Sequence, residues 1–117
     1  MKSALILLAH GSRDARWQSP FLALASDLNL PLAFLEMTTP TLADVMQAQM
    51  ANGANHIRVL PLFMASGGAH VNRDIPQLLL DARAQYPQVT FEQLPALGEH
   101  PEVQAVFRRV IQGLKSS

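Results

Sequence analysis

The chain has 117 residues, of which 49% are hydrophobic and 15% charged, a composition typical of one globular domain with a sizeable core. Nine basic and nine acidic residues cancel, which argues against a strongly basic nucleic-acid-binding face. The chain has no cysteine, so disulfides, zinc fingers and iron–sulfur clusters are excluded, and any metal ion must be bound through nitrogen and oxygen atoms.

The first residues imitate a signal peptide only faintly. Residues 4–9 are apolar, but this run is shorter than the roughly 7–15 residues of a signal-peptide core, and His10 ends it. No segment approaches the ~20 apolar residues of a membrane span. We therefore expect one cytoplasmic domain, residues 1–117, with neither a membrane nor a nucleic acid as partner.

Four short apolar segments have the length and composition of buried strands. In chain order they are Ala4–Ala9, Leu32–Leu35, Val59–Leu62 and Val89–Leu94. Apolar residues at helical spacing follow each of them and predict four helices.

Capping and turn residues indicate where these helices begin. We expect the first at Ser19-Pro20, the second at Thr39-Pro40-Thr41 with a stop at Asn52-Gly53, the third near Pro76 and the last at His100-Pro101. The apolar positions are Phe21, Leu24, Ala25 and Leu28; then Leu42, Val45, Met46 and Met50; then Ile75, Leu78, Leu79 and Ala82; then Val103, Val106, Phe107, Val110, Ile111 and Leu114.

The alternation of strands and helices predicts an α/β fold, a parallel four-stranded sheet with helices on both faces. Right-handed crossovers favour the flavodoxin-like strand order 2-1-3-4, with a switch point between the first and third strands. In this order His10, Glu36 and His70 follow three adjacent strands at the same edge of the sheet. Ligands bind at this edge in open α/β sheets.

Two imidazoles and one carboxylate suit a divalent transition metal such as cobalt, nickel, iron or zinc, with coordination positions left open. Neutral imidazole also accepts protons near neutral pH. Arg13 and Arg73 are suited to carboxylates or phosphates. The candidates for contact with a flat ligand are Met37, Leu62, Phe63 and Met64, together with the close backbone approach that Gly67 and Gly68 allow.

Structural roles are open for the same residues. A histidine after a strand is often a loop hydrogen-bonder, and Glu36 has the position of a cap for the next helix. Arg13–Asp14 and Arg73–Asp74 can be solvated ion pairs. The methionines can equally be core filler.

The two other histidines are expected to be structural. His56 precedes the third strand and so lies at the opposite edge of the sheet, and His100 belongs to a helix start. No Gly-x-Gly-x-x-Gly or Walker A pattern occurs, which weakens dinucleotide and nucleotide-triphosphate functions.

Several blocks of sequence, taken together, resemble the motifs of a known family. They are Leu8–Asp14, Phe34-Leu35-Glu36 with Pro40, Pro61-Leu62-Phe63, Gly68-x-His70 with Asp74-Ile75-Pro76, and Leu97-Gly98-x-His100-Pro101. In order and spacing they resemble the class II tetrapyrrole chelatases of the CbiX type over nearly the whole chain. That family includes sirohydrochlorin cobaltochelatase and ferrochelatase, which insert a divalent metal into sirohydrochlorin on the way to cobalamin or sirohaem, without a nucleotide.

The resemblance implies a short-form sirohydrochlorin chelatase, ATP-independent, half the length of two-domain chelatases and expected to be a homodimer. By position, His10 and His70 match the metal-handling histidines and Glu36 the acidic partner, so these three are the expected catalytic and metal-binding residues. The expected substrate-binding residues are Arg13, Arg73, Phe63, Met64, Gly67 and Gly68.

The resemblance implies no cofactor beyond the metal substrate, with Co²⁺ expected first and Fe²⁺ or Ni²⁺ as alternatives. Met37-Thr38-Thr39 stands where many relatives have a more acidic or smaller segment, and no histidine-rich tail is present, so the metal is open. Two other functions stay open. One is a non-catalytic carrier of metal or tetrapyrrole, and the other is a flavodoxin-like module for an anionic small molecule.

Overall fold

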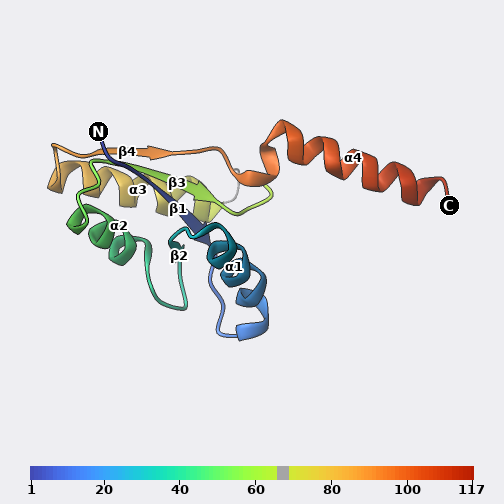
Figure 1. Cartoon of the computed structure of the whole chain (residues 1–117), viewed down its shortest axis with the longest axis horizontal. Coiled ribbons are helices and arrows are strands. Elements are labelled where there is room, and N and C mark those ends of the chain that lie inside the picture. Colours follow the sequence, from blue (N-terminus) through green and yellow to red (C-terminus); the bar gives the residue numbers. More distant parts are fainter. Residues whose placement is uncertain (66–68) are drawn as a thin grey trace.

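The computed structural model describes residues 1–65 and 69–117, without the side chains of residues 69–72. Its strands form one parallel sheet in the order β2-β1-β3-β4, which confirms the predicted order (Figure 1). The strands are β1 (Ser3–Ala9), β2 (Leu32–Phe34), β3 (His56–Pro61) and β4 (Thr90–Gln93). Because all four run parallel, their carboxyl ends lie at one edge of the sheet.

The helices alternate with these strands, as the sequence predicts. They are α1 (Ala15–Leu28), α2 (Leu42–Ala51), α3 (Ala69–Gln85) and α4 (Pro101–Lys115), with a 3₁₀ turn, η1 (Leu97–Glu99), before α4. No helix in the described part of the chain is long and apolar enough to cross a membrane.

Two buried clusters lie on opposite faces of the sheet, because successive strand residues point to opposite faces. The larger joins the sheet to α2 and α3 and includes Ile6, Leu8, Leu42, Val45, Met46, Ile57, Val59, Ile75, Leu79 and Phe91. The smaller joins β1 and β2 to α1 and consists of Leu7, Ala9, Ala25, Leu32 and Phe34. The face with the smaller cluster is therefore covered only over β1 and β2.

Helix α4 forms where the sequence predicts it but does not cover the sheet. It extends away from the body of the domain, and its packing is chiefly against η1 (Figure 1). None of its residues is buried. The domain is accordingly elongated, with extents of 54 × 28 × 28 Å. Helices therefore cover both faces of the sheet, as expected. On one face, however, α1 is the only covering helix in the described part of the chain.

Two predicted helix starts are wrong. Asp14 caps α1 and Ala69 begins α3, so that Pro20 and Pro76 lie inside these helices. Both prolines are exposed. At an exposed position water can hydrogen-bond to the carbonyl that loses its helical N–H donor, which limits the cost of an internal proline.

The third strand is longer than predicted. It begins at His56, three residues before the expected Val59, and alternates between half-buried and buried residues. His56 and Arg58 lie on the face that α1 covers only over β1 and β2, and both contact the carboxylate of Glu92 on β4. Polar side chains are tolerated there because this part of the face is not enclosed, and their polarity hid the start of the strand.

Two glycines allow close backbone approaches that join distant segments. Gly11 has φ +98°, and a Cβ there would overlap the carbonyl oxygen of Glu36. At Gly98 a Cβ would lie within 2.7 Å of three backbone atoms of Met64. The first approach holds the loop after β1 against the segment after β2, and the second holds η1 against the segment after β3.

Substitution of Gly98 tests the second approach. We expect Gly98→Ala to lower the free energy of unfolding by about 1–3 kcal/mol, because the methyl group meets backbone atoms that cannot rotate away. Gly113→Ala is the matched control: a Cβ there meets nothing within 4 Å, and alanine should stabilise the helix by up to about 1 kcal/mol. Urea unfolding of both variants checks this, and an equal effect of the two would contradict the close packing at Gly98.

Gly11 is tested in the same way against Gly53, which has a similar φ of +95° but only Lys2 side-chain atoms at 3.8 Å or more. Both alanine variants carry the cost of a left-handed residue, about 1–2 kcal/mol. We expect Gly11→Ala to be less stable than Gly53→Ala by a further ~1–3 kcal/mol, since only its methyl group overlaps backbone. Equal urea midpoints would show that the loops after β1 and β2 separate freely.

Candidate functional site

His10 directly follows β1 at the carboxyl edge of the sheet. Its ring stacks on that of Phe63, which lies two residues beyond β3, with centroids 4.0 Å apart and planes 20° from parallel. Phe63 is only 7% exposed, whereas His10 is exposed. A buried aromatic surface thus supports one face of the imidazole, while the other face is open to a ligand.

Glu36 is joined to His10 through the main chain. The backbone ladder of β1 and β2 continues past the strands: Leu35 N–H donates to Ala9 O at 2.9 Å and Glu36 N–H to His10 O at 3.0 Å. Glu36 is half-buried, and Met37 after it takes a positive φ of 69° and is 63% exposed. The structure therefore brings these two predicted site residues together at the sheet edge.

A capping role for Glu36 is not supported. The start of α2 is satisfied by a capping box in which Thr41 Oγ1 accepts from Asp44 N–H and the Asp44 carboxylate accepts from Thr41 N–H, both at 3.1 Å. These two residues leave no capping task for Glu36. Its carboxylate makes no hydrogen bond or ion pair within the described residues, and neither does the His10 side chain.

His70 lies in the first turn of α3, on the segment that follows β3. Its side chain, like Gly67 and Gly68, falls outside the described residues. The predicted convergence of His70 with His10 and Glu36 therefore stays a prediction. Among the described residues no group of three metal-binding side chains occurs, and this set does not include the His70 imidazole.

Beside His10 is a cavity of about 360 Å³ with mainly apolar walls. It is lined by Ala9, His10, Gly11, Ser12, Trp17, Gln18, Phe21, Phe34 and Leu62. Trp17 and Gln18 were missed from sequence, because the first helix was expected to begin only at Ser19. The sequence signal that could have identified this site was Trp17, the sole tryptophan of the chain. In the structure Trp17 is 72% exposed.

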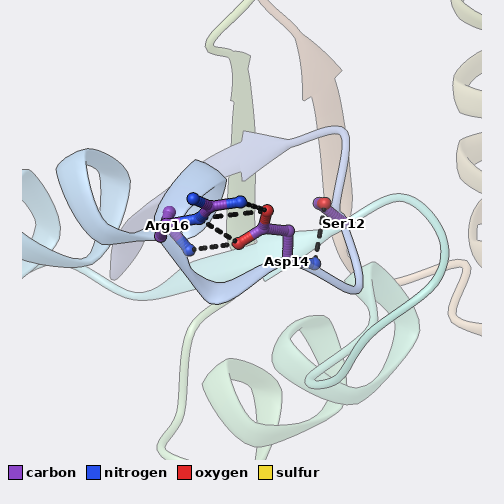
Figure 2. A network of polar contacts seen from close by, with 3 residues as sticks. All are labelled: Ser12, Asp14 and Arg16. Atoms are coloured by element: carbon purple, nitrogen blue, oxygen red, sulfur yellow. Dashed lines mark hydrogen bonds and ion pairs between the residues drawn. The ribbon is translucent and has the colours of Figure 1, made fainter.

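Arg13, in the loop after β1, is not paired with Asp14, the aspartate that follows it. Asp14 binds Arg16 instead, with Arg16 Nη2 2.7 Å from Asp14 Oδ2, and also accepts from Arg16 N–H as the cap of α1 (Figure 2). The Arg16 guanidinium, followed by its backbone N–H, lowers the pKa of Asp14 from its usual value. The exposed Arg13 has no ion pair in the described part of the chain and stays available for a ligand.

The other candidates differ in exposure. Arg73 is exposed on α3, and Met64 is 64% exposed beside α4, where it shares an apolar hollow with Val106 and Ile111. His100 caps α4 with its Nδ1 3.1 Å from Glu102 N, as predicted.

His56 is structural, as predicted. It begins β3 at the opposite edge of the sheet, and its Nε2 lies 3.2 Å from Glu92 Oε1.

Known proteins similar to this chain are named as sirohydrochlorin chelatases. A sirohydrochlorin ferrochelatase of Bacillus subtilis is 31% identical over 94% of this chain, and a sirohydrochlorin cobaltochelatase of Saccharolobus islandicus is 38% identical over 64% of it. The chain spans 45% of the length of the first relative and 62% of the second.

Solved structures agree with the arrangement of the elements. A CbiX protein from Marinobacter aquaeolei VT8 superposes with a TM-score of 0.83 at 29% identity, covering 99% of this chain and 97% of that one. The sirohydrochlorin chelatase SirB from Bacillus subtilis subspecies spizizenii, solved in complex with cobalt, gives 0.80 at 30% identity over 96% of this chain and 51% of that one. The CbiX family model matches residues 4–114. This chain belongs to the CbiX family.

Proposed function

We propose that this chain inserts a divalent metal ion into sirohydrochlorin, with Co²⁺ the first candidate and Fe²⁺ or Ni²⁺ next. The observation that carries the proposal is the placement of His10. It is exposed at the carboxyl edge, stacked on Phe63 and tied to Glu36, in a family whose relatives are named sirohydrochlorin chelatases.

The reaction needs groups that take protons and hand over a metal. Each turnover exchanges two pyrrole N–H protons for one M²⁺, so two protons must leave the macrocycle. A neutral imidazole accepts a proton or binds a divalent metal through the same nitrogen. His10, with its ring open to solvent, would do one of these, and Glu36 and His70 complete the proposed catalytic and metal-binding set.

The substrate carries many carboxylates around a flat ring. Arg13, which has no ion pair among the described residues, and the exposed Arg73 are the proposed anchors for these groups. Phe63 and Met64 would lie against the ring, and Gly67 and Gly68 would let the backbone approach it. The mainly apolar cavity beside His10 supports such a contact.

Several properties follow as parts of the same proposal. The chain would act as a single domain, without ATP and with no cofactor beyond its metal substrate, in the cytoplasm. It would serve cobalamin or sirohaem biosynthesis and would assemble as a homodimer. Nitrogen and oxygen ligands follow the general affinity order of divalent metals, so the metal is decided by measurement and not by the ligand set.

The deciding experiment is a metallation assay of the purified protein. Sirohydrochlorin is mixed with Co²⁺, Fe²⁺ or Ni²⁺ in turn, and the visible spectrum follows the change from free to metallated macrocycle. Multiple turnovers above the uncatalysed rate support the chelatase. Stoichiometric binding of the macrocycle or the metal without turnover would identify a carrier.

We expect His10→Ala to lower the metallation rate by about 100-fold, the usual contribution of a positioned acid–base group. His56→Ala is the matched control, because that histidine lies at the opposite edge of the sheet and should leave the rate near that of the unsubstituted protein. A rate unaffected in His10→Ala, or equal losses in both variants, would contradict the site.

For Glu36→Gln we expect a metallation rate at least ~10-fold lower, with little change in the melting temperature. The amide keeps the shape of the side chain, but it accepts protons and binds metal ions less well than a carboxylate. Glu92→Gln, at the other end of the sheet, is the control for loss of a carboxylate. A large loss of thermal stability with near-normal specific activity would mean that Glu36 is structural.

A further inference from the structure

The exposed side chain of Trp17 borders the cavity beside His10. Trp17 lies in the first turn of α1, and its side chain makes no hydrogen bond within the described part of the chain. It also lines a second hollow with Arg16, Pro20 and Phe21, so it has the cavity on one side and solvent on the other. A large aromatic side chain left this exposed adds little to the core and is typical of a ligand contact.

The cavity continues the smaller buried cluster toward the carboxyl edge of the sheet. Four of its lining residues belong to that cluster or are packed against it, namely Ala9, Phe34, Phe21 and Leu62. Its polar lining residues are His10, Ser12 and Gln18, and no acid, arginine or lysine lines it. Such walls favour apolar groups and disfavour carboxylates, which would lose their hydration there without a cationic partner.

The start of α1, which carries Trp17, is held against the loop after β1. Asp14 caps the helix and binds the Arg16 guanidinium, and its own N–H donates to Ser12 Oγ at 3.0 Å (Figure 2). Trp17 N–H donates to Asp14 O at 3.0 Å. Gln18 Nε2 donates to Ser12 O. The main chain under the indole is therefore fixed before a ligand arrives, which lowers the entropy cost of a contact made there.

Size and polarity decide which part of a tetrapyrrole suits this cavity. At about 360 Å³ it lies near the lower end of the roughly 300–1,000 Å³ of small-molecule sites, so it holds part of a macrocycle and not all of it. Sirohydrochlorin carries ring methyl groups beside its carboxylate side chains. The methyl groups match the uncharged walls, whereas the carboxylates match Arg13, which does not line the cavity.

We propose that Trp17 is a specificity-determining contact for the substrate. Its indole closes the cavity over a methyl-bearing part of the sirohydrochlorin ring, while the carboxylates stay outside with Arg13. This inference rests on the proposed function, because it names the part of that substrate which the cavity receives. An indole N–H donates but has no basic nitrogen, so Trp17 neither takes a proton nor hands over a metal. It acts on the binding of the macrocycle and not on the chemical step.

The first test compares KM and kcat for sirohydrochlorin between variants. We expect Trp17→Ala to raise KM about 30-fold, the loss usual for a buried aromatic anchor, and to leave kcat within about 3-fold. Trp17→Phe should recover most of the affinity, because its ring restores an apolar wall.

Leu22→Ala is the matched control for this test. Leu22 is 50% exposed on the same helix and does not line the cavity, so its removal should leave KM unchanged. Circular dichroism checks that all the variants fold. An unchanged KM in Trp17→Ala, or a loss in kcat alone, overturns the proposal.

The second test isolates the methyl contact by binding without metal, followed in the absorption spectrum of each ligand. Uroporphyrin III carries the same carboxylate side chains as sirohydrochlorin but none of its ring methyl groups, so attraction to arginine is common to both. We expect the unsubstituted protein and Leu22→Ala to bind sirohydrochlorin at least ~10-fold more tightly than uroporphyrin III, as for a methyl group in an apolar pocket. In Trp17→Ala the ratio of the two Kd values should fall toward one. An equal ratio in Trp17→Ala and Leu22→Ala overturns the proposal.

The two tests separate this inference from the proposed function. If the unsubstituted protein metallates sirohydrochlorin and Trp17→Ala does so with the same KM, the chelatase stands and the role of Trp17 is wrong. If the unsubstituted protein binds sirohydrochlorin without turnover, the chelatase is wrong, and the Kd ratios decide the role of Trp17. If it neither binds nor metallates sirohydrochlorin, both are wrong.

Discussion

The site depends on the position of β1 between two parallel neighbours. Its residues Ile6 to Ala9 are at most 2% exposed, and it pairs with β2 on one side and β3 on the other. Leu62 N–H donates to Leu8 O and Leu35 N–H to Ala9 O, so the ladder extends past both neighbouring strands. His10 therefore leaves the sheet at a fixed place, between the segments that carry Phe63 and Glu36. Because this ladder is buried, the packed core holds the residues of the site in fixed positions.

The strand order and the meeting of His10 with Glu36 could be predicted because both follow from backbone rules. Parallel strands with right-handed crossovers share a carboxyl edge, and the residue after each strand must appear there. The starts of α1 and α3 could not be read from prolines, since an exposed proline is tolerated inside a helix. Trp17 and Gln18 were missed for that reason, although they line the cavity beside His10.

The path of α4 could not be predicted from the sequence. Periodicity shows that a helix has an apolar face, but it does not show what covers that face. The stripe from Val103 to Leu114 is the same whether it packs on its own sheet or on a partner. What decides the path is the junction at Gly98 and His100, where a close approach to Met64 and a side-chain cap set the direction of the helix. Such a junction depends on contacts between distant segments, which local patterns do not reveal.

The exposure of His10 is consistent with the chemistry proposed for it. A group that delivers a metal must not hold it in a closed cage, and an imidazole stacked on one face with its edge in solvent binds through few ligands and releases readily. The same exposure leaves a flat macrocycle with walls on only some sides, because one domain offers a shelf at the sheet edge. The segment of Met64, which follows β3 at the same edge, is held there by its packing on Gly98 and its contact with α4. An open ligand set for a metal and an open shelf for a flat ligand thus both follow from the exposed position of His10 at the edge of the sheet.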